Sequence, residues 1–150
     1  MKRNALLTVL LPVAILLAVL LIFAAKTGYS RVLEANWGIS LPFRSIYTEI
    51  YEKDASGFHG DGLRYHVYRY KYEDYIDLMF AWRSRENETI FHSSYSEAAE
   101  TWLDELQVPA EERPDYAACA YWYKAQEDHS ELIVFWDQER NRLYILESFL

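Results

Sequence analysis

The chain has little of what many small functional domains depend on. Its 150 residues contain one cysteine, five glycines, four prolines and two methionines. A single cysteine forms neither an intramolecular disulfide nor a CxxC metal motif, so a disulfide scaffold and a cysteine-based zinc site are both excluded. Cys119 stands in the apolar run YAACAYWY, which predicts a buried structural thiol and not a reactive one.

Positive charge is scarce beyond the first part of the chain. From residue 34 onward there are 11 Lys and Arg against 23 Asp and Glu, a net charge of −12. An acidic domain repels the phosphate backbone, so nucleic acid is not expected as a partner. Residues 1–33, by contrast, carry four cations and no acidic residue.

Residues 5–25 have no charge and consist mainly of Leu, Val, Ile, Ala and Phe. As a helix, such a stretch spans roughly 30 Å, the hydrocarbon thickness of a bilayer. The sequence therefore predicts a transmembrane anchor over residues 1–27. A retained anchor is favoured over a cleaved signal peptide because the run is long and no clean A-x-A site follows it. Lys2 and Arg3 precede the run, which predicts a single-pass protein of the cell membrane with its C-terminal domain outside the cytoplasm.

Residues 28–41 are predicted to connect the anchor to one domain over residues 42–150. Alternating residue types predict strands in the first part of this domain, a change to helical spacing predicts two helices, and three later runs separated by short polar turns predict strands again. The predicted strands cover residues 43–54, 62–72, 116–125, 131–137 and 141–150, and the predicted helices cover residues 72–80 and 95–106.

The order β-β-α-α-β-β-β predicts an α+β fold, in which an antiparallel sheet carries both helices on one face. The last three strands are expected to form a meander, because their connections are short. Residues 131–137 contain the run LIVFW, which is apolar on both faces and is therefore expected to be the central strand.

The motif GFHGDG lies between the first two predicted strands. A phosphate-binding glycine loop precedes a helix, whereas a strand follows here, so phosphate binding is not expected. Glycines and short polar residues suit the tip of a wide hairpin. His59 and Asp61 are the side chains with further chemistry to offer, and the candidate binding residues are Gly57, Phe58, His59, Gly60, Asp61 and Gly62.

A strand–GFHGDG–strand hairpin behind an N-terminal hydrophobic segment resembles a group of uncharacterised secreted or membrane-anchored small proteins of Gram-positive, Firmicutes-type bacteria. The resemblance covers Gly57 to Gly62, the flanking strands and the overall layout. It implies an extracytoplasmic bacterial protein and implies no activity.

Two other groups of residues invite a functional interpretation. Glu111, Glu112 and Asp115 are carboxylates that stand close together among prolines, which indicates a solvated acidic loop and not an acid–base pair. One face of the hairpin is rich in tyrosine, and these rings are expected to cover the helices or, if exposed, to contact a partner. They are Tyr47, Tyr51, Tyr68 and Tyr70.

The sequence predicts no catalytic residue, metal or cofactor, and it lacks the G-x-S-x-G elbow of serine hydrolases. The favoured function is a non-enzymatic, membrane-anchored module that binds a protein or the cell envelope. One alternative is a small metal-dependent or hydrolytic enzyme centred on His59 and Asp61. Another is a structural subunit that a membrane complex contacts through residues 5–25.

Overall fold

The computed structural model describes residues 28–41, 47–57, 61–72, 76–80 and 91–150, together with Pro12 and Ile15; for residues 56, 77, 78 and 91–94 it describes the backbone alone. The chain divides into two compact units, Met1–Phe43 and Arg44–Leu150. The elements are helix α2 (Gly28–Trp37), strands β1 (Tyr47–Ser56) and β2 (Gly62–Tyr70), helices α3 (Ile76–Met79) and α4 (Phe91–Glu105), the 3-10 helix η2 (Ala110–Glu112), and strands β3 (Ala120–Ala125), β4 (Glu131–Asp137) and β5 (Arg142–Phe149).

Helix α2 belongs to the first unit. Tyr29, Leu33 and Trp37 are buried and recur at four-residue spacing, so they form one apolar stripe. The helix ends at Gly38, which has a φ of 71° and donates its backbone N–H to the carbonyl of Glu34 at 3.0 Å. This left-handed glycine is a common helix stop. The expected connector over residues 28–41 therefore contains a capped helix.

The membrane-spanning helix that the sequence predicts over residues 5–25 falls outside the described residues, apart from Pro12 and Ile15. Within the described part of the chain, no helix is long and apolar enough to cross a membrane. The predicted fold class is wrong in the described part of the chain, because it placed both helices on one face of the sheet and the structure places them on opposite faces. The structure shows an α+β fold built on one five-stranded antiparallel sheet.

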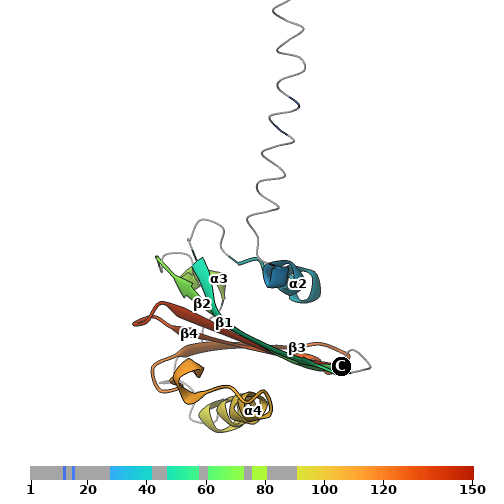
Figure 1. Cartoon of the computed structure of the whole chain (residues 1–150), viewed down its shortest axis with the longest axis vertical. Coiled ribbons are helices and arrows are strands. Elements are labelled where there is room, and N and C mark those ends of the chain that lie inside the picture. Colours follow the sequence, from blue (N-terminus) through green and yellow to red (C-terminus); the bar gives the residue numbers. More distant parts are fainter. Residues whose placement is uncertain are drawn as a thin grey trace, which may run out of the picture. The chain divides into compact units, whose positions relative to one another are not determined.

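The sheet has the strand order β1-β2-β5-β4-β3, and every neighbouring pair is antiparallel (Figure 1). The expected hairpin of β1 and β2 and the expected meander of β3, β4 and β5 are both present. Strand β4 is buried from Leu132 to Asp137, in agreement with its apolar sequence. It is not the central strand, however, because β5 occupies that position by pairing with β2, with Tyr65 opposite Leu146.

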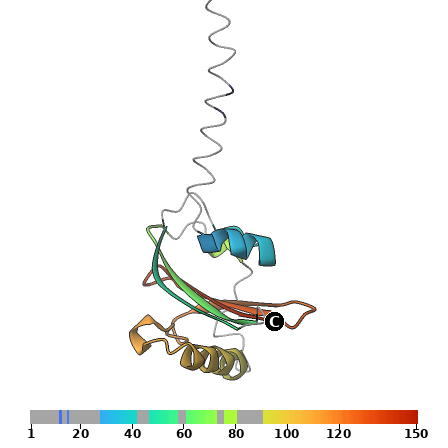
Figure 2. The same ribbon diagram turned by 45° about the vertical axis from the view of Figure 1, so that its right-hand side comes forward.

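The two helices of the second unit lie on opposite faces of the sheet (Figures 1 and 2). Helix α4 packs Ala99, Leu103 and nearby Leu106 into a core with Tyr65 of β2 and residues of β3, β4 and β5. Phe80, which follows α3, instead contacts Trp122 with a ring separation of 4.9 Å. The prediction that both helices cover one face is therefore wrong. Strands β4 and β5 are buried on both faces, so helices on a single side cannot cover them.

The first predicted helix is also shorter than expected. Tyr72, at which it was expected to begin, is exposed and not helical, and α3 starts at Ile76. Residues 73–75 lie outside the described part of the chain. The helical spacing of apolar residues therefore extends over more of the sequence than the observed helix does.

Candidate functional site

The GFHGDG motif forms the tip of the β1–β2 hairpin, since Ser56 pairs with Gly62. The backbone N–H of Gly57 donates to the carbonyl of Asp61, and a Cβ atom at position 57 would collide with the Asp61 carboxylate. A side chain at position 57 would therefore displace the Asp61 carboxylate and crowd the Asp61 carbonyl, and glycine avoids both. Phe58, His59 and Gly60 lie outside the described residues, so the hypothesis of an enzyme centred on His59 and Asp61 stays a prediction.

A β-bulge near the middle of β1 rearranges the side chains of the hairpin. Glu49 pairs with Tyr68, whereas Tyr51 pairs with Val67 and Glu52 with His66, so Ile50 is the extra residue. In a regular strand, residues three positions apart point to opposite faces. The extra residue reverses this relation, because a bulge sets two residues against one on the partner strand. Glu49 and Glu52 therefore share the face of His66.

His66 lies beside these two carboxylates on the face away from α4. Its Nδ1 atom is 2.6 Å from Oε1 of Glu49, and only 5% of the residue is exposed. Burial lowers the pKa of His66 below its ordinary value of 6.5, and the hydrogen bond and charge of Glu49 offset this only in part. A neutral imidazole donates its Nδ1–H to the Glu49 carboxylate.

A second carboxylate pair flanks this group along the hairpin. The guanidinium of Arg64 contacts Asp54 at 3.1 Å and Glu147 at 3.4 Å, and it lies 3.9 Å from the ring centre of Phe149. Glu147 is 1% exposed. A carboxylate buried to this extent needs a counter-charge, and Arg64 supplies it. Arg64 is therefore committed to two acids and is not available to neutralise Glu49 or Glu52.

Glu49, Glu52 and His66 are a group that could hold a metal ion, since one ligand atom from each lies within 4.8 Å of the others. Sequence reasoning missed this group. Strict alternation assigns Glu49 and Glu52 to opposite faces of β1, and the bulge at Ile50 carries no glycine that would mark it.

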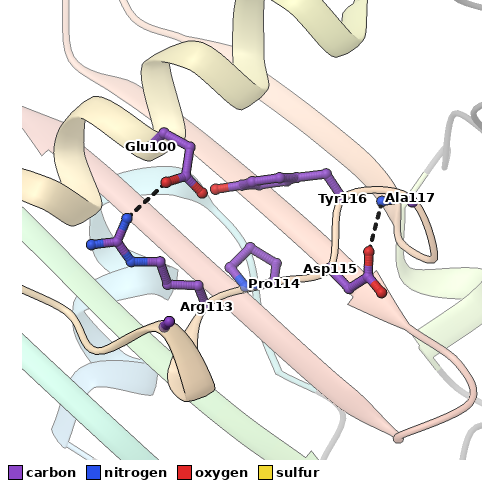
Figure 3. Close-up of a pocket in the computed structure, with 7 residues that line it drawn as sticks. Glu100, Arg113, Pro114, Asp115, Tyr116 and Ala117 are labelled. Carbon is purple, nitrogen blue, oxygen red and sulfur yellow. Dashed lines mark hydrogen bonds and ion pairs between the residues drawn. The ribbon is translucent and has the colours of Figure 1, made fainter.

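A separate cleft of about 680 Å³ lies beside the end of α4 and is lined by Glu100, Ala110, Arg113, Pro114, Asp115, Tyr116 and Ala117. Figure 3 shows that Glu100 lies between Arg113 and the ring of Tyr116. Arg113 contacts Glu100 and Asp104 at 2.7 Å each and donates Nε–H to the carbonyl of Val108. These contacts tie the loop to α4, so Arg113 is a structural residue of this cleft.

The acidic loop next to the cleft also serves the fold. Oδ1 of Asp115 accepts the backbone N–H of Ala117 at 3.1 Å, and the backbone carbonyl of Glu112 accepts the hydroxyl of Tyr65. Glu111 is exposed. Asp115 is exposed as well, as the expectation of a solvated loop requires, whereas Glu112 is half-buried and its Oε2 atom is buried.

The predicted tyrosine-rich face of the hairpin is divided by the bulge. Tyr47 contacts Tyr68 and Tyr70 on the face away from α4, with ring separations of 5.4 Å. Tyr51 instead packs against Tyr65 on the α4 side at 5.9 Å. Tyr68 and Tyr70 are buried, so the second-strand rings belong to the interior and do not form an exposed partner surface.

Cys119 is buried, as its apolar sequence predicts. Burial raises the pKa of the thiol above its ordinary value, and the charges of Asp137 and Asp115 act in the same direction. A thiol with a raised pKa is a poor nucleophile and a poor metal ligand at neutral pH. Among the described groups, the hairpin cluster therefore has the strongest case for chemistry.

Comparison with known proteins finds no match to this chain among protein-family models, curated proteins or solved structures.

Proposed function

We propose that the protein is a non-enzymatic binding module, held at a membrane by residues 5–25, whose strand β1 receives an extended basic segment of a partner protein. One observation carries the proposal: β1 is an edge strand. It stands at the end of the strand order and, within the described part of the chain, pairs with β2 alone. An unpaired strand edge accepts an added strand through main-chain hydrogen bonds.

The part of β1 that follows the bulge is suited to strand addition. Residues 51–56 pair with β2 in continuous register, and residues 52–55 are exposed. A regular strand of this kind offers evenly spaced backbone groups along its outer edge. The proposed surface also includes the predicted binding residues Gly57–Gly62, because they directly follow β1 in the chain.

Charge determines the kind of segment that fits. The region from residue 34 onward has a net charge of −12. Glu52 and Asp54 are exposed on β1, two positions apart, and so face the same side. Complementary charges speed association and exclude acidic competitors. The favoured segment therefore carries Lys or Arg at alternate positions, facing Glu52 and Asp54.

Site-specific photo-crosslinking in membranes tests the strand-addition site. A photoreactive residue replaces Lys53 on β1 or, as the control, Glu105 on α4; both positions are exposed. We expect an adduct from position 53 alone, with the crosslinked peptide mapping to an extended segment that contains Lys or Arg. Reversing the charge of Glu52 and Asp54 to lysine should reduce its yield at least about tenfold, because like charges then meet.

The same crosslinking experiment contains the result that would overturn the proposal. Equal adducts from positions 53 and 105, or a yield unaffected by the two charge reversals, would show that β1 is not the contact. Crosslinks that map to an acidic or helical segment would have the same consequence.

Membrane attachment is a separate part of the proposal, and the uncharged, apolar sequence of residues 5–25 supports it. We expect the full chain to resist alkaline carbonate extraction from membranes and a chain lacking residues 5–25 to be released. Protease added outside intact cells should digest the C-terminal domain, because Lys2 and Arg3 favour a cytoplasmic N-terminus. Release of the full chain by carbonate would contradict attachment through these residues.

A further inference from the structure

The geometry points to a metal site on the hairpin: Glu49, Glu52 and His66 bind one divalent first-row transition-metal ion such as Zn²⁺ or Mn²⁺. Glu52 also belongs to the proposed peptide-binding edge of β1, so the metal site is tested on the chain alone, without a peptide. Its three potential ligand atoms lie within 4.8 Å of one another. Ligands around tetrahedral zinc are separated by about 3.3 Å, given bond lengths near 2.0–2.1 Å. Small rotations of two flexible glutamate side chains close that difference.

The bulge in β1 brings these ligands together. Glu49 is opposite Tyr68 and Glu52 is opposite His66, and these β2 residues are two positions apart on one face. His66 comes from the neighbouring strand. The ligands thus come from two hydrogen-bonded strands, β1 and β2. Backbone pairing fixes the spacing of the ligands in the absence of an ion.

The balance of charge at the group favours a cation. In the described part of the chain, no lysine or arginine pairs with Glu49 or Glu52, and the one ion-pair contact of Glu49 is the 2.6 Å contact with His66. The nearby guanidinium of Arg64 is taken by Asp54 and Glu147. Two carboxylates beside a buried imidazole therefore carry an uncompensated negative charge, which a divalent ion would neutralise.

The ligand set selects the class of ion. One imidazole nitrogen with two carboxylate oxygens suits zinc, manganese or iron, whereas calcium and magnesium prefer oxygen ligands alone. The ion takes the place of the proton that Nδ1 of His66 shares with Glu49, so binding releases a proton. His66 is nine-tenths buried and Glu52 is exposed, so water can complete the coordination from the side of Glu52.

Metal binding to the untagged full chain in detergent tests this site. After dialysis against a chelator, Co²⁺ reports coordination through its visible absorption, and Zn²⁺ is titrated calorimetrically. We expect one ion per chain, competition between Co²⁺ and Zn²⁺, and no displacement by Ca²⁺. Glu52→Gln and His66→Gln should each raise the dissociation constant at least about tenfold, because each removes one of three protein ligands.

Matched variants control for binding elsewhere on the surface. Glu105→Gln removes an exposed carboxylate of α4, and His129→Asn removes an exposed histidine whose φ of 69° asparagine tolerates. Both should bind the ion as the unaltered chain does. Circular dichroism checks folding; if His66→Gln unfolds, Glu52→Gln decides the outcome, because Glu52 is exposed.

Two results would overturn the inference. One is the absence of a bound ion in the unaltered chain at millimolar Co²⁺ or Zn²⁺. The other is unchanged affinity in folded Glu52→Gln, which would show that any bound ion sits elsewhere.

Discussion

The two faces of β2 differ in how they are stabilised. Toward α4 the strand presents Leu63, Tyr65 and Val67, which join the apolar core. Away from α4 it presents Arg64 and His66, which contact carboxylates of β1 and β5. Apolar burial stabilises a fold by about 1.5–3 kcal/mol per large side chain, whereas a buried ion pair often contributes little net stability. The apolar face of β2 is therefore expected to contribute most of the stability, and the polar face little.

Alkaline pH should have the largest effect, because it acts on both faces. Burial raises the pKa of Tyr65 on the α4 side and of Tyr70 on the other side above the ordinary 10.0. The unfolded chain therefore loses the two hydroxyl protons at a lower pH than the folded chain does. The contribution of these groups to the free energy of unfolding is complete below pH 10 and is lost as the pH rises above it. We expect the last tyrosines, followed by tyrosinate absorbance, to ionise only as circular dichroism is lost. Full ionisation in a folded chain would contradict this.

Removing apolar volume from the α4 side should have the next largest effect. Leu103 is 0% exposed, so Leu103→Ala leaves a cavity and should lower the free energy of unfolding by about 3 kcal/mol. Urea denaturation followed by tryptophan fluorescence measures it. Glu105→Ala, at an exposed position of the same helix, is the control and should change stability by under about 0.5 kcal/mol. An equal loss of stability in Leu103→Ala and Glu105→Ala would mean that the main core does not lie between α4 and the sheet.

Breaking the charge pairing on the other face should have a smaller effect. Arg64→Leu leaves Glu147 buried without that counter-charge and should cost about 2 kcal/mol. The double variant Arg64→Leu with Glu147→Leu should regain most of the loss, since an apolar pair needs no counter-charge. Arg69→Leu, exposed on the same strand, is the control. A double variant less stable than Arg64→Leu would show that the pair itself stabilises the fold.

Two tyrosine hydroxyls permit the finest comparison of the faces. The hydroxyl of Tyr65 donates to the carbonyl of Glu112, whereas that of Tyr70 has no hydrogen-bond partner among the described residues. Tyr65→Phe should therefore cost about 1 kcal/mol, and Tyr70→Phe should change the free energy of unfolding by almost nothing. Thermal or urea denaturation distinguishes the two. A larger loss at Tyr70 would reveal a partner for that hydroxyl.

Local sequence patterns predicted the five strands that the structure describes, but the third was expected from residue 116 and begins at Ala120, because residues 116–118 form turns. The predicted strand over residues 131–137 matches β4 at both ends. Polar turn residues stand on either side of its apolar run and so mark where the strand begins and ends. The short connections likewise predicted antiparallel pairing of β3, β4 and β5. Helical spacing was less reliable: it extended the first helix to Tyr72, whereas α3 covers Ile76–Met79.

The candidate metal site could not be predicted in the same way. Its ligands meet because Ile50 is an extra residue in β1, and a period-two pattern contains no signal for a bulge without glycine. The sequence directed attention to His59 and Asp61 at the hairpin tip. Of these, Asp61 is described, and its backbone carbonyl accepts the N–H of Gly57.

The sequence by itself determined the acidic charge and the apolar, uncharged character of residues 5–25, because both are counted directly from the residues. It also determined the strands, because alternation is a pattern of a few neighbouring residues. The tertiary structure decided which face each helix covers, that β5 is central, and that Glu49, Glu52 and His66 lie together. These features depend on pairing between residues far apart in the chain. A single bulge in β1 changes which side chains share a face.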